Sequence, residues 1–530
     1  MTLRAEMDVL YISDMSEIEL KFLLDKKKSS EIWARAKASK LTRDAPITRT
    51  LRSIYLDTPE HALKKAGIAL RLRRDGRRWI QGVKTGRTLH GGLSQGGELE
   101  TPAPGGRVCL DAIPDPAVRE AIVDRVNGAL LQPVCETVIK RSTGELTLAD
   151  GTRAELAVDV GEVRAGERSA ELSELEIELL DGNASGLFDI ASILVPEGGL
   201  RFSRLSKAAR GYLLAEEGRI DVPLAPRTAE NVALDPSQTA EQAAREVLRE
   251  CLDQIATNVL VVRQMDDIEG PHQLRVGLRR LRSAFSVYAP VLRSPAMKRL
   301  DAEARWFGRE VGALRDLDVV ANDMARREAE RHPDEPELSA LADLVVRQAQ
   351  ERRALLRKLL EGARAQAFLI DLARFVETRG WLAPLDFGQT ERLGTPIATL
   401  ARQSLAKRWK RVAQHAHGLE TLSVEQRHEL RKQLKKLRYA VEFFCSLFPT
   451  KRVDPFLKRL KKLQTVFGDL NDAATLKTMF TGADVPGAGD PSIQRAIGWM
   501  VGASQARAEF GWIGAKDLWK DLERVRPFWR

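Results

Sequence analysis

The sequence predicts an α+β protein in which a strand-rich N-terminal half precedes an all-α C-terminal half. Between residues 12 and 182, polar and apolar side chains alternate with the period of two that is typical of strands. From about Thr239 onward the pattern becomes that of amphipathic helices rich in Leu, Ala, Arg and Glu. A repeat within the helical half adds a third observation, because it predicts a duplicated helical unit.

The elements of the N-terminal half are short and separated by glycine-containing turns. The clearest strand patterns are residues 16–22, 69–73, 98–100, 153–159 and 174–179. Asp75-Gly76, Asp150-Gly151 and Asp181-Gly182 are turn signals, and helical patterns lie at 30–39, 115–127 and 184–194. We therefore expect a mostly antiparallel domain of about 200 residues, a common domain size.

The helical half contains long amphipathic stretches and a self-repeat. The stretches are residues 240–263, 295–321, 337–360 and 423–447. The segment His272-Gln-Leu-Arg-Val-Gly-Leu-Arg-Arg-Leu-Arg282 returns 156 residues later as His428-Glu-Leu-Arg-Lys-Gln-Leu-Lys-Lys-Leu-Arg438. Gly312-Ala-Leu-Arg-Asp316 recurs at the same offset as Gly468-Asp-Leu-Asn-Asp472. An offset shared by two separate segments indicates duplication of a whole helical unit.

Length and charge limit the classes of protein that fit. A chain of 530 residues exceeds what one core usually supports, so two or three domains are expected. Residues 1–230 hold 34 Lys+Arg against 35 Asp+Glu, and the remaining residues hold 50 against 39. This excess points to an anionic partner of the helical half. The four cysteines lack metal-ligand spacing, and no apolar run reaches the 18 residues of a membrane span, so we expect a cytoplasmic protein without structural zinc or a membrane partner.

Several strands of the N-terminal half carry charges on one face. Glu17, Glu19 and Lys21 share a strand face by the period of two, and other strands carry either cations or carboxylates. One such strand would look the same as a solvated outer surface, but here the charges segregate by strand. If the sheet closes with these faces inward, carboxylates would hold a hard divalent cation and Lys/Arg would hold phosphate oxygens.

These residues resemble the CYTH, or triphosphate tunnel metalloenzyme, superfamily over residues 12–215. Glu17-Ile-Glu19-Leu-Lys21 is similar to its ExExK signature, and the later landmarks follow in order, among them Arg71-Leu-Arg73, Lys84-Thr, Glu174-Leu-Glu176-Ile-Glu178 and Ser206-Lys207. The resemblance implies an eight-stranded antiparallel tunnel with flanking helices that acts on a triphosphate chain with Mg²⁺ or Mn²⁺. It implies catalytic roles for Glu17, Glu19 and Lys21, metal binding by Glu17, Glu19, Asp159, Glu174 and Glu176, and substrate binding by Lys21, Arg71, Arg73, Lys84, Arg141, Arg153 and Lys207.

Two positions qualify that resemblance. Relatives often have an arginine two residues before the glutamate that matches Glu98, whereas this chain has Gly96. Glu178 lies at the end of its strand, where a solvated surface and a role in the site both fit.

The repeated helices place their cations on one stripe. His272, Arg275, Arg279 and Arg282 fall at i, i+3, i+7 and i+10, beside an apolar stripe, and the second copy repeats both. This pattern resembles the CHAD domain, whose family association is with inorganic polyphosphate. The implied polyphosphate-binding residues are His272, Arg275, Arg279, Arg280, Arg282, His428, Arg431, Lys435, Lys436 and Arg438. The alternatives are a structural histidine and a salt-bridged helix face, and nucleic acid is an unlikely partner because interleaved aromatic residues are lacking.

We therefore predict a CYTH domain at residues 12–217, a linker at 218–238 and a CHAD domain at 239–528 with repeats at about 239–390 and 395–528. The combination resembles bacterial inorganic triphosphatases, which implies metal-dependent hydrolysis of tripolyphosphate to pyrophosphate and phosphate. The CHAD domain would bind long-chain polyphosphate and associate the protein with polyphosphate granules. A thiamine triphosphatase, an adenylate-cyclase-type tunnel enzyme and a non-catalytic polyphosphate-binding scaffold remain alternatives.

Overall fold

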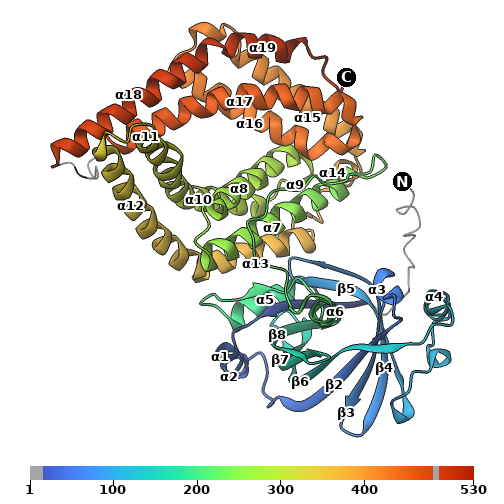
Figure 1. The fold of residues 1–530 in the computed structure, drawn as a ribbon. Helices are drawn as coiled ribbons and strands as arrows, with labels where there is room; N and C mark the ends of the chain where they lie inside the picture. Colours follow the sequence, from blue (N-terminus) through green and yellow to red (C-terminus); the bar gives the residue numbers. More distant parts are fainter. Residues whose placement is uncertain (1–15, 482–486, 488) are drawn as a thin grey trace. The chain divides into compact units, whose positions relative to one another are not determined.

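The computed structural model describes residues 16–481, 487 and 489–530, which form two compact units (Figure 1). Unit 1 extends to Pro223 and also includes Glu361–Thr378. Unit 2 comprises Leu224–Leu360 and Arg379–Arg530.

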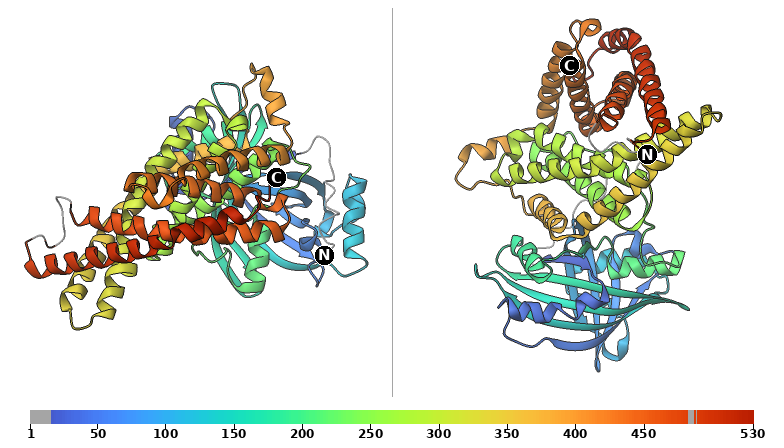
Figure 2. Two further views of the ribbon diagram at one scale, coloured as in Figure 1. Left: turned by 90° about the horizontal axis from the view of Figure 1, so that it is seen from above. Right: turned by 90° about the vertical axis from the view of Figure 1, so that its left-hand side faces the viewer.

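Eight antiparallel strands of unit 1 close into a barrel (Figures 1 and 2). The strands are β1 (Ser16–Leu23), β2 (Ile47–Asp57), β3 (Ala69–Asp75), β4 (Arg78–His90), β5 (Leu93–Pro102), β6 (Gln132–Thr147), β7 (Arg153–Ala165) and β8 (Arg168–Asp181). Their order is β5-β4-β3-β2-β6-β7-β8-β1, and β1 pairs again with β5. β9 (Arg201–Phe202) adds two residues beside β1. The predicted eight-stranded antiparallel barrel is confirmed.

Turn chemistry and one irregularity shape the β3–β4–β5 part of the barrel. Gly76 has φ of +59°, which glycine adopts without strain, so Asp75-Gly76 forms the tight connection from β3 to β4. The pairing of β4 with β5 shifts register between Thr85 and Thr88, where a β-bulge interrupts the ladder. A bulge changes the direction in which the following side chains point.

Short helices flank the barrel. They are α1 (Lys26–Ser29), α2 (Ile32–Ala38), α3 (Ala62–Lys65), α4 (Pro116–Val126), α5 (Ser185–Leu194) and α6 (Lys207–Glu217). α6 begins at Ser206, whose hydroxyl accepts a hydrogen bond from the Ala209 backbone N–H, and this cap sets Lys207 at the first helical position. α6 packs against β6 and β7.

Unit 1 also contains a helix from much later in the sequence. α13 (Ala363–Glu377) packs on α5, whose Leu187, Phe188 and Ile190 are fully buried. The Gln366 side chain donates to the Val195 carbonyl oxygen and accepts the Leu200 backbone N–H at 2.9 Å. The amphipathic residues 363–377 therefore form part of the core of unit 1.

The regular elements of unit 2 are all helices in its described residues. Its longer helices are α7 (Ala240–Gln264), α8 (Glu269–Val287), α10 (Pro295–Asp318), α12 (Pro336–Glu361), α15 (Ile397–His415), α16 (Val424–Phe444), α17 (Thr450–Met479), α18 (Pro491–Ile513) and α19 (Ala515–Arg524). The shorter ones are α9 (Ala289–Leu292), α11 (Arg326–Arg331) and α14 (Phe387–Leu393), and a π-helical segment, Val319–Ala325, follows α10. Capping boxes at Thr239 and Ser423 begin α7 and α16.

The two repeated segments occupy equivalent places in unit 2. α8 packs between α7 and α10, and α16 packs between α15 and α17, while α8 and α16 also contact each other. α17 in turn lies beside α18, labelled in Figure 1. The apolar stripes that the sequence predicts on α8 and α16 are buried, which confirms their core-facing role: Leu274, Leu278, Leu281, Phe285, Leu430, Leu434, Leu437 and Val441.

The segment between α6 and α7 is irregular and anchored at both ends. All of residues 218–238 are described, and they contain neither helix nor strand. Within unit 1, the Asp221 carboxylate accepts a hydrogen bond of 2.6 Å from buried Arg210. Within unit 2, Arg227 pairs with Glu250 at 2.7 Å. None of the described helices has the length and apolar character that a membrane crossing requires.

Candidate active site

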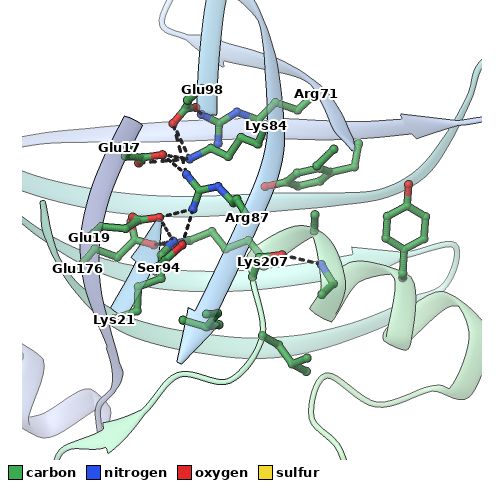
Figure 3. A pocket seen from close by; sticks show the side chains of 18 of the residues that line it. Glu17, Glu19, Lys21, Arg71, Lys84, Arg87, Ser94, Glu98, Glu176 and Lys207 are labelled. Atoms are coloured by element: carbon green, nitrogen blue, oxygen red, sulfur yellow. Dashed lines mark hydrogen bonds and ion pairs between the residues drawn. The ribbon is translucent and has the colours of Figure 1, made fainter. Parts of the chain in front are cut away.

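A cavity of about 1130 Å³ occupies the interior of the barrel (Figure 3). Nine of the predicted site residues line it, from five strands and α6: Glu17, Glu19, Lys21, Arg71, Arg73, Lys84, Arg141, Glu176 and Lys207. The period-two alternation places these side chains on the inner face of each strand. The charged strand faces therefore point into this cavity.

Lys207 and Lys21 join the carboxylates on one side of the cavity. The Lys207 Nζ lies 2.9 Å from Asp159, 2.8 Å from Glu174 and 2.7 Å from Glu176. The Lys21 Nζ lies 2.8 Å from both Glu19 and Glu176. Burial opposes the charge of each lysine, but the adjacent carboxylates outweigh it and raise both pKa values above the ordinary range. Both ammonium groups are therefore charged throughout the physiological range.

Arg141 contacts the same carboxylates from β6. Its guanidinium donates to both oxygens of Asp159, at 2.8 and 2.6 Å, and to Glu176 at 2.5 Å. Asp159 and Glu174 are essentially fully buried, at 0% and 1% exposure, and stand behind the residues that line the cavity. Burial alone would raise the pKa of Glu176, but Lys207, Lys21 and Arg141 hold it well below the usual range. This side of the cavity is a network of paired charges.

A second group of paired charges comes from β3, β4 and β5. Arg71 lies 2.7 Å from Glu98 and 3.0 Å from Glu100, while Arg73 lies 2.7 Å from Glu100. The Lys84 Nζ lies 2.5 Å from Glu98 and 3.0 Å from Glu17. Despite its burial, Glu98 has a pKa lowered to about 2 because Arg71 and Lys84 are so close. Glu98 therefore orients two of the predicted phosphate-binding cations.

Arg87 is a cation of the cavity that the sequence did not predict. Its guanidinium contacts both Glu17 and Glu19 and donates to the Ser94 Oγ at 3.0 Å (Figure 3). Arg87 lies an odd number of residues beyond Lys84, so alternation along β4 assigns it to the outer face. The bulge after Thr85 reverses that assignment, and a lone arginine in the sequence gives no sign of the bulge.

Glu178 and Glu155 also line the cavity. In the strand register Glu178 lies opposite Glu19 on one side and Glu155 on the other. Burial, followed by repulsion from those two carboxylates, raises the pKa of Glu178 to about 7. Of the two readings left open for Glu178, the structure favours a place in the cavity.

Arg153 stands apart from the other predicted site residues. It is absent from the cavity lining, and its half-exposed guanidinium pairs with Glu145 at 2.6 Å near the start of β7. Its substrate-binding role stays a prediction.

The acidic side chains of the cavity suit a hard divalent cation by their chemistry. Glu17, Glu19, Glu176 and Glu178 offer only carboxylate oxygens, the ligands that Mg²⁺ and Mn²⁺ favour. The Arg87 guanidinium bridges Glu17 and Glu19, which shows that this pair can share one cation. Within residues 16–481, 487 and 489–530, no three acidic, histidine or cysteine side chains are gathered for a metal without rearrangement. These carboxylates therefore fit a divalent metal once the lysine and arginine side chains that pair with them move away.

The predicted polyphosphate residues of unit 2 have several different surroundings. Arg275 and Arg279 of α8 and Arg431 and Lys435 of α16 lie close enough for their charges to perturb one another. Asp316 accepts a hydrogen bond of 2.5 Å from Arg275, so it orients this group. Burial and the three arginines lower the pKa of Lys435 to about 6. We refer to Arg275, Arg279, Arg431 and Lys435 as the interhelical cluster.

The remaining members have other surroundings. His272 lies near the interhelical cluster, where burial and then Arg315 lower its pKa, while His428 and Lys436 are exposed. Arg282 pairs with Asp301 at 3.1 Å, and Arg438 pairs with Glu442 at 2.8 Å.

Arg280 has a core position instead. It is 3% exposed, pairs with Glu442 at 3.1 Å and stacks over the Phe443 ring. This environment favours a structural role for Arg280, and its predicted contact with polyphosphate stays untested.

Comparison with known proteins follows the same division of the chain. The CYTH domain model matches residues 15–212, and the CHAD domain model matches residues 246–481. An inorganic triphosphatase of Haemophilus influenzae is 32% identical over 169 residues, which cover 32% of this chain and 46% of that protein. The match thus spans less than half of the relative's length.

Solved structures include two with similar parts. The crystal structure of the CHAD domain from the plant Ricinus communis is 27% identical, with a TM-score of 0.48, covering 57% of this chain and 98% of that chain. A putative adenylyl cyclase from Hippeastrum, described as having a dominant triphosphatase activity, is 18% identical with a TM-score of 0.28, covering 38% of this chain and 96% of that chain. These two family matches show that the chain joins a CYTH domain, at residues 15–212, to a CHAD domain, at residues 246–481.

Proposed function

We propose that this protein is a metal-dependent inorganic triphosphatase that hydrolyses tripolyphosphate to pyrophosphate and phosphate. The observation that carries the proposal is the barrel cavity, in which lysines and arginines face carboxylates around one shared space. The similarity to an inorganic triphosphatase supports it over the part of the chain that aligns. A cavity built only to bind anions would gain nothing from Glu17, Glu19 and Glu176, because carboxylates repel phosphate unless a cation lies between them.

The cationic residues would bind and orient the phosphate chain. Arg71, Arg73 and Lys84 line one side and Lys21, Arg141 and Lys207 the other, so a linear triphosphate can meet positive charge along its length. Arginine forks suit two oxygens of a phosphate, and lysine offers a point charge. Preorganised cations of this kind stabilise the charge on the transferred phosphoryl group.

Glu17, Glu19 and Glu176 would hold the metal, with Asp159 and Glu174 behind them to orient Arg141 and Lys207. Bound Mg²⁺ or Mn²⁺ would polarise phosphoryl oxygens and lower the pKa of water. In the reaction, a water oxygen forms a bond to a terminal phosphorus, the bond from that phosphorus to its bridging oxygen breaks, and a cavity carboxylate takes the water proton. Glu178, with a pKa of about 7, is a suitable acceptor in this proposal.

For unit 2 we propose binding of long-chain inorganic polyphosphate at the interhelical cluster. Four cations from two helices meet there with few carboxylates to balance them, and a polyanion would remove their mutual repulsion. The role would be to concentrate substrate or to bring the protein to polyphosphate stores. A cytoplasmic location with association with polyphosphate granules belongs to the same proposal.

Phosphate release tests the reaction directly. Tripolyphosphate, ATP and thiamine triphosphate would be compared with Mg²⁺, with Mn²⁺ and with EDTA. We expect selective, metal-dependent release from tripolyphosphate. Preferential hydrolysis of thiamine triphosphate, or formation of cyclic AMP from ATP, would assign the cavity to an organic triphosphate instead. No turnover of any substrate, with tight polyphosphate binding retained, would leave a binding scaffold.

A further inference from the structure

Arg87 has a position that the proposed reaction does not explain. Its side chain is 16% exposed, and its guanidinium contacts Glu17 and Glu19 from across the strand between them. Among the residues that the structure describes, its Nε has no hydrogen-bond partner. The Arg87 guanidinium thus pairs with the two carboxylates that would bind the proposed metal.

The β4 bulge and Gly96 together make this position possible. Thr85 pairs with Gly97 and Thr88 with Gln95, so Gly86 and Arg87 both face the single residue Gly96 on β5. Gly96 in turn lies opposite Glu17 on β1. Arg87, Gly96 and Glu17 therefore form a row across three strands, and the middle position has no side chain.

Gly96 is the opening through which Arg87 reaches the carboxylates. A Cβ at position 96 would lie 2.5 Å from the Arg87 Cγ and 2.9 Å from the Thr85 carbonyl oxygen. Both separations are far below van der Waals contact, and the Thr85 oxygen belongs to the backbone and cannot rotate away. Any larger residue at position 96 would exclude Arg87 from its present place. This chain has no arginine at position 96, and Arg87 from the neighbouring strand β4 occupies the space beside Gly96 instead.

We infer that Arg87 is a positioning residue that serves as a built-in cation for the Glu17–Glu19 pair and turns to a phosphate oxygen when that pair binds a metal ion. The inference rests on the proposed function, because it concerns the same cavity. Two close carboxylates repel each other unless a cation lies between them, and the bridging guanidinium supplies that cation. Once displaced, its fork matches phosphate geometry, and Lys84 shows that cations on this strand already face the cavity.

The alternative is a purely structural ion pair that ties β4 to β1. Such a pair would affect stability without affecting the metal or the substrate. The two interpretations therefore predict different effects of removing Arg87 on the affinity for Mn²⁺ and on the KM for tripolyphosphate.

The test is Arg87→Gln in the full-length protein. Calorimetric titration with Mn²⁺ alone should show about tenfold tighter binding than wild type, because the competing guanidinium is gone. The KM for tripolyphosphate should rise about tenfold with little change in kcat, the expected sign of lost substrate binding. Arg77→Gln is the matched control: it removes the same charge from the exposed β3–β4 turn and should leave both values unchanged.

A variant at Gly96 extends the test. Gly96→Ala should displace Arg87 and shift Mn²⁺ affinity in the same direction as Arg87→Gln.

Unchanged Mn²⁺ affinity and KM in Arg87→Gln, with only a lower melting temperature, would overturn the inference and leave a structural ion pair. If wild type itself hydrolyses no tripolyphosphate, the proposed function fails. The Mn²⁺ titrations would then still decide whether Arg87 competes for the carboxylates.

Discussion

The barrel and the helical unit both gather cations, but they balance them differently. In the barrel, Lys207 meets three carboxylates within 2.9 Å, and its pKa is raised. In the interhelical cluster, Lys435 meets mainly arginines, and its pKa is lowered to about 6. The same type of side chain is thus stabilised as a cation in one unit and destabilised in the other.

This difference suggests different ligands for the two regions. A cavity whose charges already neutralise one another suits a metal–triphosphate complex, in which a cation and an anion enter together. The cavity carboxylates would then pair with the metal, and the cavity lysines and arginines would pair with the phosphates. A cluster with excess positive charge gains most from a polyanion that brings no metal of its own. Variants that remove one charge should therefore have opposite consequences in the two units.

The largest effect is expected for Lys207→Met in the barrel. Removal of this ammonium would leave Asp159, Glu174 and Glu176 buried, with Arg141, Lys21 and Arg210 as the neighbouring cations. Breaking a buried charge pair typically costs about 3–5 kcal/mol, and we expect a loss of that order in the free energy of unfolding. Urea denaturation would measure it, with exposed Lys26→Met as the control. A loss below about 1 kcal/mol, the scale of a surface pair, would show that the network is not a stabilising unit.

Glu19→Gln should come next. It keeps the size of the side chain and removes one carboxylate of the pair bridged by Arg87. We expect kcat for tripolyphosphate to fall at least 100-fold, a magnitude typical when one group that stabilises the transition state is removed. Polyphosphate binding by unit 2 should be unaffected. The control is Glu60→Gln, which changes an exposed carboxylate. Full activity in Glu19→Gln would refute the catalytic role of the pair.

The interhelical cluster should respond to pH. Because the native pKa of Lys435 lies near 6, the residue is largely neutral at pH 8 and gains charge as the pH falls. Polyphosphate affinity should then rise about tenfold between pH 8 and pH 6, with proton uptake on binding. In the free protein the sign is opposite: the unfolded state binds more protons between pH 6 and about 10, so the stability contributed by neutral Lys435 increases with pH across that window.

Calorimetry in buffers of different ionisation enthalpy would count the protons. Lys435→Met should abolish most of the pH dependence, whereas His272→Gln controls for the nearby imidazole. Affinity should also fall steeply with salt, as it does for contacts between cations and a polyanion. A pH profile that is unchanged in Lys435→Met would place the proton uptake elsewhere.

The smallest effect is expected for Arg153→Ala. Its guanidinium is half exposed and paired with Glu145 outside the cavity lining. We expect KM for tripolyphosphate to change less than about twofold, since exposed ion pairs contribute little. Arg141→Ala, which removes a cation inside the cavity, is the positive comparison. A large rise in KM for Arg153→Ala would mean that the substrate extends to the end of β7.

Much of the fold and site could be predicted because the signals were local. Glu17, Glu19 and Lys21 reach the cavity because alternation along one strand fixes their face, and the stripes of α8 and α16 follow from the helical period. The position of Arg87 in the cavity was not predicted because the direction of its side chain depends on the register between β4 and β5. The contacts of Gln366 were not predicted for a related reason. An amphipathic pattern indicates which face of a helix is apolar but not which element that face packs against, and α13 packs on α5, about 180 residues earlier in the sequence.

The sequence by itself determined which residues are charged, which face of each strand or helix they occupy, and that the chain is a strand-rich half followed by a duplicated helical half. These properties follow from periods of two and 3.6 residues within single elements. Only the tertiary structure decided which charges meet. Lys207 meets Asp159, Glu174 and Glu176 because barrel closure brings α6 to β7 and β8, and Arg87 meets Glu17 because Gly96 leaves its place open. Electrostatic energies depend on separations of a few ångströms between residues far apart in sequence, and those separations exist only after folding.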